Sequence, residues 1–320
     1  MKALVFEGVH QPLAYKEVAS PQATEEQVVV NLKAAALNHR DNWITKGMYP
    51  GLRPDVILGS DGAGVVSERE VILNPSVNWG DDQRFQAPDY HILGMPGNGT
   101  FAEQIAVNPS QIVDKPAHLS MEQAAALPLA GLTAYRALVS RCQVRAGERV
   151  LISGVGGGVA LFACQFAIAA GAEVFVTSSS EQKIETAVSL GASGGANYRQ
   201  DGWHKKLGKE TGGFDVVIDS AGGDGFANLV KLCKLGGRIG IYGGGRGTIN
   251  GLSPQIIFFK QISIHGSTMG SDQEFADMVQ FVSDHKIEPV VDSVFDLADG
   301  NDAIARMNAG LQFGKIVLRI

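Results

Sequence analysis

Glycines followed by an apolar run make residues 149–171 the part of the chain best suited to bind an anion. A short apolar strand leads into glycines at positions 154, 156, 157 and 158, and the apolar run ends at Gly171. Glycine lets the backbone approach a phosphate closely, and the first turn of a helix offers unpaired N–H groups at its positive end. A tight turn before a core helix is the alternative for this pattern alone. The phosphate-loop residues predicted here are Gly154, Gly156, Gly157, Gly158 and Val159.

The segments after this turn alternate between strands and helices. We expect strands over 173–177, 214–219, 238–242 and 262–266, and helices over 181–190 and 224–235. Such alternation is typical of β–α–β units, which form a parallel sheet covered by helices on both faces. The glycine turn follows the first strand, where doubly wound sheets bind dinucleotides. The sequence therefore predicts an α/β Rossmann domain.

The end of the second strand indicates which dinucleotide is bound. An acid there would hold the ribose 2′-hydroxyl of NADH and repel the 2′-phosphate of NADPH. Residues 177–180 read TSSS, the first acid is Glu181, and Lys183 lies just behind it. One serine suffices to cap the next helix, which leaves others for a ligand. Because hydroxyls and an ammonium suit a phosphate, we expect NADPH, held by Ser178, Ser179 and Lys183.

Composition limits the remaining classes of protein. The 320 residues are 45% hydrophobic and carry a net charge of −6 at pH 7, which disfavours a nucleic acid or an anionic membrane as the main partner. The chain starts in a strand-like segment without a signal peptide, and the longest apolar stretch, 159–170, is too short to span a bilayer. Three scattered cysteines indicate a reducing compartment, so we expect a cytoplasmic protein.

The pattern of elements divides the chain into two domains. Residues 1–118 contain short β-like runs broken by glycine, proline and asparagine, and the tail adds one helix candidate and further β-like pieces. The alternating pattern occupies the middle of the chain. We therefore expect a β-rich domain over 1–118 and 268–320, interrupted by a nucleotide-binding domain over 119–267.

Several motifs, in this order, resemble the medium-chain dehydrogenase/reductase family, in its zinc-free quinone oxidoreductase and enone reductase branch. They include AALNHRD at 35–41, GSDGAGVV at 59–66, GGRIGIYGGG at 236–245 and FGKIVL at 313–318, besides the glycine turn. The resemblance covers nearly the whole chain. It implies a GroES-like β-rich catalytic domain, a nucleotide domain, a cleft between them, and a homodimer or homotetramer. Only residues 67–70 separate two strands that the family usually spaces further apart, which leaves the substrate range open.

The resemblance also argues against a metal. Asn38 stands at the place of the first zinc-binding cysteine, Ser60 at the place of the histidine, and Asp61 where zinc enzymes keep a glutamate. Zinc needs thiolate, imidazole or carboxylate ligands. Neither the three cysteines nor the seven histidines show ligand spacing, so no metal is expected.

Without a Lewis acid, hydride transfer to an activated double bond is easier than alcohol chemistry, because the negative charge spreads into a conjugated carbonyl. We therefore expect an NADPH-dependent oxidoreductase acting on a quinone or an α,β-unsaturated carbonyl. The resemblance implies that Asn38 hydrogen-bonds the nicotinamide ribose or the substrate carbonyl and that Tyr49 donates to that carbonyl, although a turn asparagine and a packing tyrosine remain alternatives. Further cofactor contacts implied by it are Thr133, Tyr198, Gly243, Gly244, Thr268, Met269, Phe313 and Lys315.

Two other functions stay open. A non-catalytic NADPH-binding or redox-sensing protein would keep the nucleotide domain without turnover, and a zinc-type alcohol dehydrogenase would need a metal. The natural substrate and the proton donor are not specified by the sequence.

Overall fold

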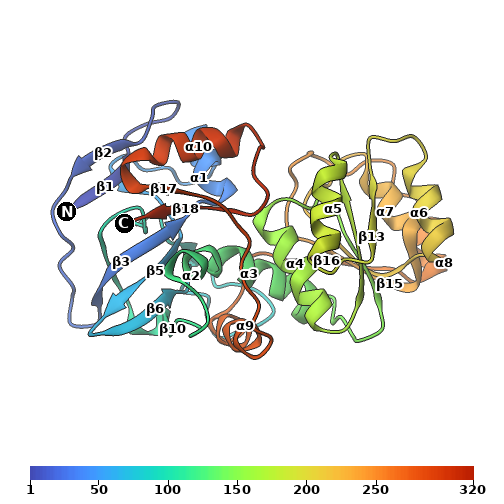
Figure 1. The fold of residues 1–320 in the computed structure, drawn as a ribbon, viewed down its shortest axis with the longest axis horizontal. Coiled ribbons are helices and arrows are strands. Elements are labelled where there is room, and N and C mark those ends of the chain that lie inside the picture. Colours follow the sequence, from blue (N-terminus) through green and yellow to red (C-terminus); the bar gives the residue numbers. More distant parts are fainter. The chain divides into compact units, whose positions relative to one another are not determined.

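The chain divides into two units, and the second is inserted into the first (Figure 1). The computed structural model describes all 320 residues. The first unit contains Met1–Leu132 and Met269–Ile320, and the second contains Thr133–Thr268. The first unit thus extends beyond residue 118, because the helix α2 (Met121–Ala126) packs against its strands.

The first unit is rich in β-structure. Its other helices are α1 (His39–Thr45), α9 (Asp272–Asp284) and α10 (Gly300–Asn308), with 3₁₀ turns η1 (Pro109–Gln111) and η3 (Leu297–Asp299), while α3 (Pro128–Tyr135) crosses the boundary. Its strands are β1 (Lys2–Phe6), β2 (Ala14–Glu17), β3 (Val28–Ala36), β4 (Val56–Ile57), β5 (Asp61–Val66), β6 (Arg69–Leu73), β7 (Ser76–Val77), β8 (His91–Ile92), β9 (Gln104–Val107), β10 (Ile112–Asp114), β17 (Val291–Asp296) and β18 (Lys315–Arg319).

Three neighbouring strands of the first unit bring distant parts of the chain to one place. In the largest sheet β3 lies between β5 and β18, and both pair with it in antiparallel register. Ala36, the last residue of β3, is opposite Asp61 on one side and Val317 on the other. The starts of β5 and β18 therefore meet the end of β3 at one edge of the sheet.

A tight turn explains the short connection at 67–70. Ser67 and Glu68 alone link β5 to β6, with φ angles of 44° and 70°. Two successive positive φ angles are typical of a type I′ turn, which matches the twist of a β-hairpin. The hairpin thus closes directly, with Val66 opposite Arg69.

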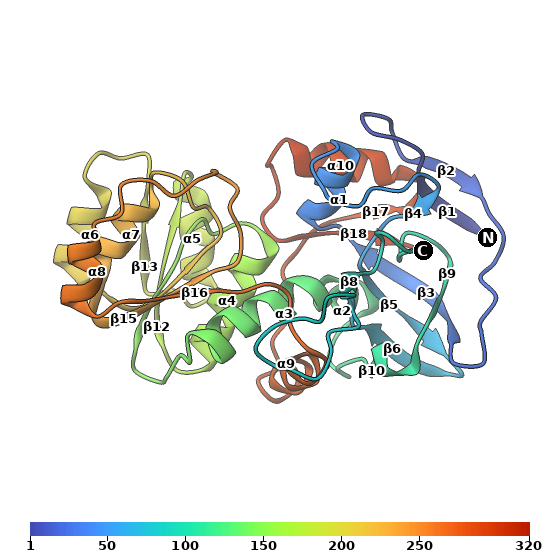
Figure 2. The same ribbon diagram turned by 180° about the vertical axis from the view of Figure 1, so that it is seen from behind.

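The second unit confirms the predicted doubly wound sheet. Its strands are all parallel and follow the spatial order β13, β12, β11, β14, β15, β16. Figures 1 and 2 place α4 and α5 on one face of this sheet and α6, α7 and α8 on the other. The strands are β11 (Arg149–Ile152), β12 (Glu173–Ser178), β13 (Gly194–Asn197), β14 (Phe214–Asp219), β15 (Cys233–Ile241) and β16 (Ser263–Gly266). The helices are α4 (Gly158–Ala169), α5 (Glu181–Ser189), α6 (Trp203–Thr211), α7 (Phe226–Leu232) and α8 (Pro254–Lys260), and a π-helical segment, η2 (Arg136–Arg141), follows α3.

One predicted helix was too long. The apolar run at 224–235 was expected to be helical throughout, but α7 ends at Leu232 and β15 begins at Cys233. Cys233 pairs with Phe214, and the register then shifts before Arg238 pairs with Val216. Gly236, at φ 71°, lies within this irregular stretch. The strand pairing overrides the helical pattern, because apolar residues serve both structures equally well.

No helix of the structure has both the length and the apolar character needed to cross a membrane.

Candidate functional site

The glycine turn of the second unit leaves space for an anion. Gly154 and Gly156 have φ angles of 70° and 135°, which non-glycine residues rarely adopt. A Cβ atom placed on Gly154 or Gly157 would meet no other atom within 4 Å, so the surface beside the turn is open there. The turn is tied to the neighbouring strand, because Gly154 N donates to Thr177 Oγ1 at 3.0 Å and Val155 N to Thr177 O at 2.7 Å.

The helix after the turn presents an unfilled positive end. α4 begins at Gly158 with Gly157 as its N-cap, no side chain caps it, and no acid stands in its first turn. The first N–H groups of a helix seek an acceptor and favour negative charge. The loop predicted from Gly154 to Val159 therefore fits a pyrophosphate.

The serines after β12 have distinct tasks. Ser178 is buried and its Oγ accepts from Ser180 N, while Ser180 Oγ accepts from Lys183 N and so caps α5. Ser179 is partly exposed, and none of the bonds described for this turn uses its hydroxyl. Of the three serines, Ser179 is the one best placed for a ligand.

The two charged residues beside the serines also differ in their surroundings. Glu181 Oε1 accepts from Asn197 Nδ2 and from Gln200 Nε2, each at 3.0 Å, so this carboxylate is held toward β13. The Lys183 side chain lies against the glycine turn, because a Cβ placed on Gly156 would be 3.1 Å from Lys183 Cδ and 3.4 Å from its Nζ. The ammonium is thus beside the glycine turn, whereas the backbone of Lys183 contacts the serine turn.

Other predicted cofactor residues lie at the carboxyl ends of the strands. Tyr198 follows β13, is exposed, and donates its backbone N–H to Ser178 O. Gly243 and Gly244 follow β15, where a side chain at Gly243 would be 3.0 Å from Ser220 O. Thr133 is buried inside α3 rather than at its start, so it is not a helix cap.

The remaining predicted residues flank the point where the chain returns to the first unit, or lie within that unit. Thr268 is exposed, and Met269 is buried with φ 43°. Phe313 is half-buried and donates its backbone N–H to Asp292 Oδ1 at 2.9 Å. Lys315 is only 4% exposed, and its contacts form the centre of a second cluster.

A buried polar cluster joins the ends of the three neighbouring strands β3, β5 and β18. Lys315 Nζ donates to Asn38 Oδ1 and to Asp61 Oδ2, both at 2.7 Å, and Asn38 Nδ2 donates to Asp61 Oδ2 at 2.9 Å. Asp61 Oδ1 accepts from Leu129 N, at the first turn of α3, at 2.7 Å. The side chains of Asn38, Asp61 and Lys315 are called the Asn38 cluster below. Burial of its ion pair is sustained by this set of hydrogen bonds.

Arg40, which the sequence analysis did not single out, brings a second cation next to Tyr49. Its Nη1 donates to Ser60 Oγ at 2.6 Å and to Leu93 O at 2.7 Å, and its Nε donates to Tyr49 OH at 3.3 Å. The guanidinium carbon also lies 4.8 Å from the centre of the Tyr49 ring, within the range of a cation–π contact. Because Tyr49 OH accepts from Arg40, its own hydrogen remains available for donation.

Burial perturbs the pKa of an acid in the first turn of helix α1. Asp41 is fully buried, its Oδ2 accepts from Asn38 N at 2.8 Å, and its Oδ1 has no hydrogen-bond partner. Burial raises the pKa of Asp41 to about 6, although Arg40 and the backbone of Asn38 partly oppose this. The neighbouring His39 has a lowered pKa because of desolvation and the charge of Lys315.

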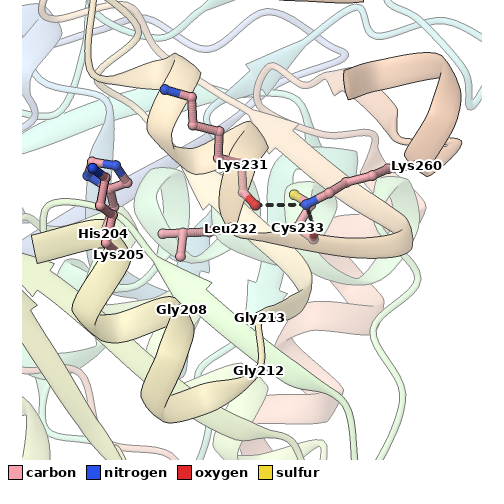
Figure 3. A pocket seen from close by; sticks show the side chains of 9 residues that line it. All are labelled: His204, Lys205, Gly208, Gly212, Gly213, Lys231, Leu232, Cys233 and Lys260. Atoms are coloured by element: carbon pink, nitrogen blue, oxygen red, sulfur yellow. Dashed lines mark hydrogen bonds between the residues drawn. The ribbon is translucent and has the colours of Figure 1, made fainter. Parts of the chain in front are cut away.

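A surface pocket on the second unit lies apart from the glycine turn. It has a volume of about 510 Å³ and is lined by His204, Lys205, Gly208, Gly212, Gly213, Lys231, Leu232, Cys233 and Lys260 (Figure 3). Lys260 Nζ donates to Lys231 O and Cys233 O, so the ammonium binds carbonyl groups at the end of α7. The pocket lies where β14 and β15 start, whereas the glycine turn lies at the carboxyl ends of the strands.

Comparison with known proteins agrees with both units. Residues 24–117 match the family model described as alcohol dehydrogenase GroES-like domain, and residues 158–284 match the model described as zinc-binding dehydrogenase. The chain is 36% identical to the "Zinc-type alcohol dehydrogenase-like protein YogA" of Leptosphaeria maculans, over 98% of this chain and 96% of that protein. The chain belongs to the medium-chain dehydrogenase/reductase family.

Solved structures of family members superpose along the whole chain. One described as an NAD-dependent alcohol dehydrogenase is 35% identical, covers 100% of both chains and has a TM-score of 0.93. The quinone oxidoreductase from Thermus thermophilus, described also in complex with NADPH, is 27% identical over 100% of both chains, with a TM-score of 0.85. Proteins named quinone oxidoreductase and acryloyl-coenzyme A reductase are among the further relatives. The protein is thus an oxidoreductase of this family with a GroES-like domain and a Rossmann domain.

The zinc in the family model's description does not fit the residues of this chain. No group of three histidine, cysteine or acidic side chains comes together anywhere in the structure. Cys142, Cys164 and Cys233 are all buried in the second unit, and burial raises the pKa of each thiol to about 12. At the expected ligand positions, Asn38 meets the Lys315 ammonium and Ser60 meets the Arg40 guanidinium. An amide and a hydroxyl engaged in this way supply neither the thiolate nor the imidazole that a zinc site needs.

Proposed function

We propose that this family member transfers hydride from NADPH to a quinone or to the β-carbon of an α,β-unsaturated carbonyl, without a metal. The observation that carries the proposal is the Asn38 cluster, in which the residue that the resemblance aligns with a zinc-binding cysteine is an amide hydrogen-bonded to an ammonium. Quinone and enoyl reductases among the relatives support the substrate class.

The donor set favours a conjugated acceptor over a simple alcohol. An alkoxide concentrates charge on one oxygen, and a Lewis acid is the usual means of stabilising it. Addition of hydride to a quinone or enone spreads the charge over a conjugated system, so oriented hydrogen bonds suffice. The amide of Asn38 and the hydroxyl of Tyr49 are neutral donors of this kind.

Tyr49 is the second donor in the proposed site. The cation of Arg40 stacks on its ring and donates to its oxygen, which holds the phenol in place and leaves its hydrogen for a further acceptor. We propose that Asn38 and Tyr49 hydrogen-bond the substrate carbonyl. The proton that completes the reduction then arrives from solvent or from a side chain.

The cofactor supplies hydride when it is bound, and residues of the second unit are suited to hold it. The open glycine turn and the uncapped start of α4 accept the pyrophosphate. We propose that Ser179, Lys183 and Tyr198 surround the 2′-phosphate of NADPH. Glu181, the acid that could hold an NADH ribose, is already held by Asn197 and Gln200.

A substrate panel tests this function. Purified protein is mixed with NADPH and one conjugated acceptor, which is 1,2-naphthoquinone, an enal or an enone. In a separate assay it is mixed with NADP⁺ and a saturated alcohol. The absorbance of the reduced nicotinamide is followed in each. We expect turnover with the conjugated acceptors and none with the alcohol. Binding of NADPH without turnover on any substrate would identify a non-catalytic or redox-sensing protein. Oxidation of the alcohol that requires added zinc would identify a zinc-type dehydrogenase.

We also propose a cytoplasmic location. All three cysteines are free and buried, which is compatible with a reducing compartment. Expression of the full chain with a fluorescent fusion, followed by cell fractionation, tests this.

A further inference from the structure

Lys315 is a buried ammonium whose place in the site is fixed from two sides. The residue is 4% exposed and Asp61 is fully buried. The ammonium has three N–H donors, and two of them are taken by Asn38 Oδ1 and Asp61 Oδ2 at 2.7 Å each. Its pair with Asp61 neutralises the charge, which is the condition for burying either group.

Stability alone gives a weak reason for an ion pair at this position. Replacing a buried ion pair by apolar residues of similar volume is often neutral or stabilising, because desolvation offsets the attraction. Asp61 already accepts from Leu129 N and Asn38 Nδ2 without the lysine. What only the ammonium supplies is a hydrogen bond to the amide oxygen of Asn38.

The cluster allows one orientation of the Asn38 amide. Its oxygen faces the ammonium of Lys315, and its nitrogen faces the carboxylate of Asp61. The flipped amide would place NH₂ against an ammonium and an oxygen against a carboxylate, and both contacts are repulsive. The second hydrogen on Nδ2, which no protein acceptor takes in the structure, therefore has a fixed direction.

We propose that Lys315 is a positioning residue that orients and polarises Asn38. Donation to Oδ1 draws electron density from the amide nitrogen, so the second Nδ2–H becomes a stronger donor. In the proposed reaction, this hydrogen meets the substrate oxygen on which negative charge develops. The ammonium thus acts through a neutral amide at a place where a metal would act directly, and this role rests on the proposed function.

A double-mutant cycle tests whether Lys315 acts through Asn38. The variants are Lys315→Met, Asn38→Ala and both together, with Lys315→Arg to keep the charge and exposed Lys46→Met as the control. We expect Lys315→Met to lower kcat about tenfold while the KM for quinone and for NADPH changes less than about threefold. In the Asn38→Ala background the same change should have almost no effect on kcat. Lys315→Arg should retain most of the activity.

Two further measurements separate this role from a structural one. If Lys315→Met folds poorly, the double variant Lys315→Met/Asp61→Asn replaces it, because the double variant removes both charges of the ion pair. Urea unfolding measures the stability of each variant. Isotope-labelled asparagine allows the Asn38 side-chain amide signal, assigned by its loss in Asn38→Ala, to be followed by NMR. We expect its protons to move upfield when Lys315 is removed and to stay near their original position in Lys315→Arg.

The outcomes are distinct. Equal losses of kcat from Lys315→Met with and without Asn38, or an unmoved amide signal, would overturn the proposal. If the amide signal moves but the protein reduces neither quinones nor enones, the polarisation of Asn38 by Lys315 is supported and the proposed function is wrong. A fall in unfolding free energy with unchanged kcat would assign Lys315 a structural role only.

Discussion

At the scale of single residues, buried charges of the first unit set the chemistry of the site and also its response to pH. Asp61 and Lys315 neutralise each other, and Asn38 donates a hydrogen bond to one and accepts one from the other. Asp41 differs, because one of its carboxylate oxygens is buried without a partner. That difference leads to the first prediction.

Asp41 should make the protein less stable as the pH rises from about 4 to about 6. Burial raises its pKa from 3.8 to about 6, so the folded protein keeps a proton that the unfolded chain releases. The stabilisation is complete below the unfolded pKa and is lost as the pH passes the folded one, which amounts to roughly 3 kcal/mol. Urea unfolding at several pH values measures it. Asp41→Asn should flatten the slope, whereas exposed Glu26→Gln should not; an unchanged slope in Asp41→Asn would contradict the assignment.

Lys183→Ala should separate NADPH from NADH. If the ammonium holds the 2′-phosphate, the Kd for NADPH rises about tenfold or more and that for NADH changes less than about threefold. Because Lys183 also lies against Gly156 of the glycine turn, a pyrophosphate role is the competing explanation. Fluorescence titration with both cofactors distinguishes them, with exposed Lys205→Ala as control. An equal loss of affinity for both cofactors would show that Lys183 contacts the pyrophosphate rather than the 2′-phosphate.

At the scale of elements, two adjacent glycines of the turn before α4 should respond differently to alanine. Gly156, at φ 135°, has a backbone conformation that alanine adopts only with strain, so Gly156→Ala should lower the unfolding free energy by about 1–3 kcal/mol. Gly157, at φ −85°, tolerates alanine, and its stability should change by less than about 1 kcal/mol. The added methyl of Gly157→Ala should still weaken both cofactors about tenfold or more, because it enters the open space beside the loop. If the Gly157→Ala variant is stable and binds both cofactors with normal affinity, the turn is not part of the cofactor-binding site.

The hairpin between β5 and β6 offers a test of turn geometry. Ser67 and Glu68 occupy left-handed positions that Asn and Gly prefer. The double variant Ser67→Asn/Glu68→Gly should therefore raise the unfolding free energy by about 0.5–1 kcal/mol, as measured in urea. The reversed order, Ser67→Gly/Glu68→Asn, serves as the composition-matched control and should stabilise less. A destabilised Asn-Gly variant would show that these side chains make contacts that matter more than the turn.

At the scale of the whole molecule, one edge of the second unit's sheet suggests a partner. β16 pairs with β15 on one side only, and its Ile264 is exposed. The preceding helix α8 exposes Phe258 and Phe259, whose rings lie 4.6 Å apart. An unpaired edge with nearby apolar side chains favours a second strand, so we propose that two copies of the chain associate through β16.

Light scattering after gel filtration tests this proposal. The native protein should elute as a dimer or larger homo-oligomer, and Ile264→Asp should shift it toward the monomer. Exposed Val188→Asp, on α5, is the control and should leave the assembly unchanged. A native monomer at micromolar concentration would contradict the proposal.

Local patterns were enough to predict the Rossmann sheet and the glycine turn before α4, since glycine spacing and alternating apolar runs act over short distances. The short strand β13 and helix α6 were not predicted, because β13 is glycine-rich and α6 is mostly polar. Helix α8 was missed although it is apolar, because its seven residues are too few to show a helical period. The contacts of Lys315 with Asn38 and Asp61 could not be predicted either. They link residues more than 250 positions apart through the pairing of β18 with β3. Arg40 was missed for a similar reason, since its partners Ser60 and Leu93 lie 20 and 53 positions further along the chain.

The most direct test of the account is the rate of NADPH oxidation with 1,2-naphthoquinone before and after dialysis against a strong chelator, with the zinc content measured in the same samples. We predict substoichiometric zinc throughout and an unchanged rate, because Asn38 and Ser60 supply neither a thiolate nor an imidazole for a metal. A rate that disappears with the chelator and returns with added zinc would contradict the account.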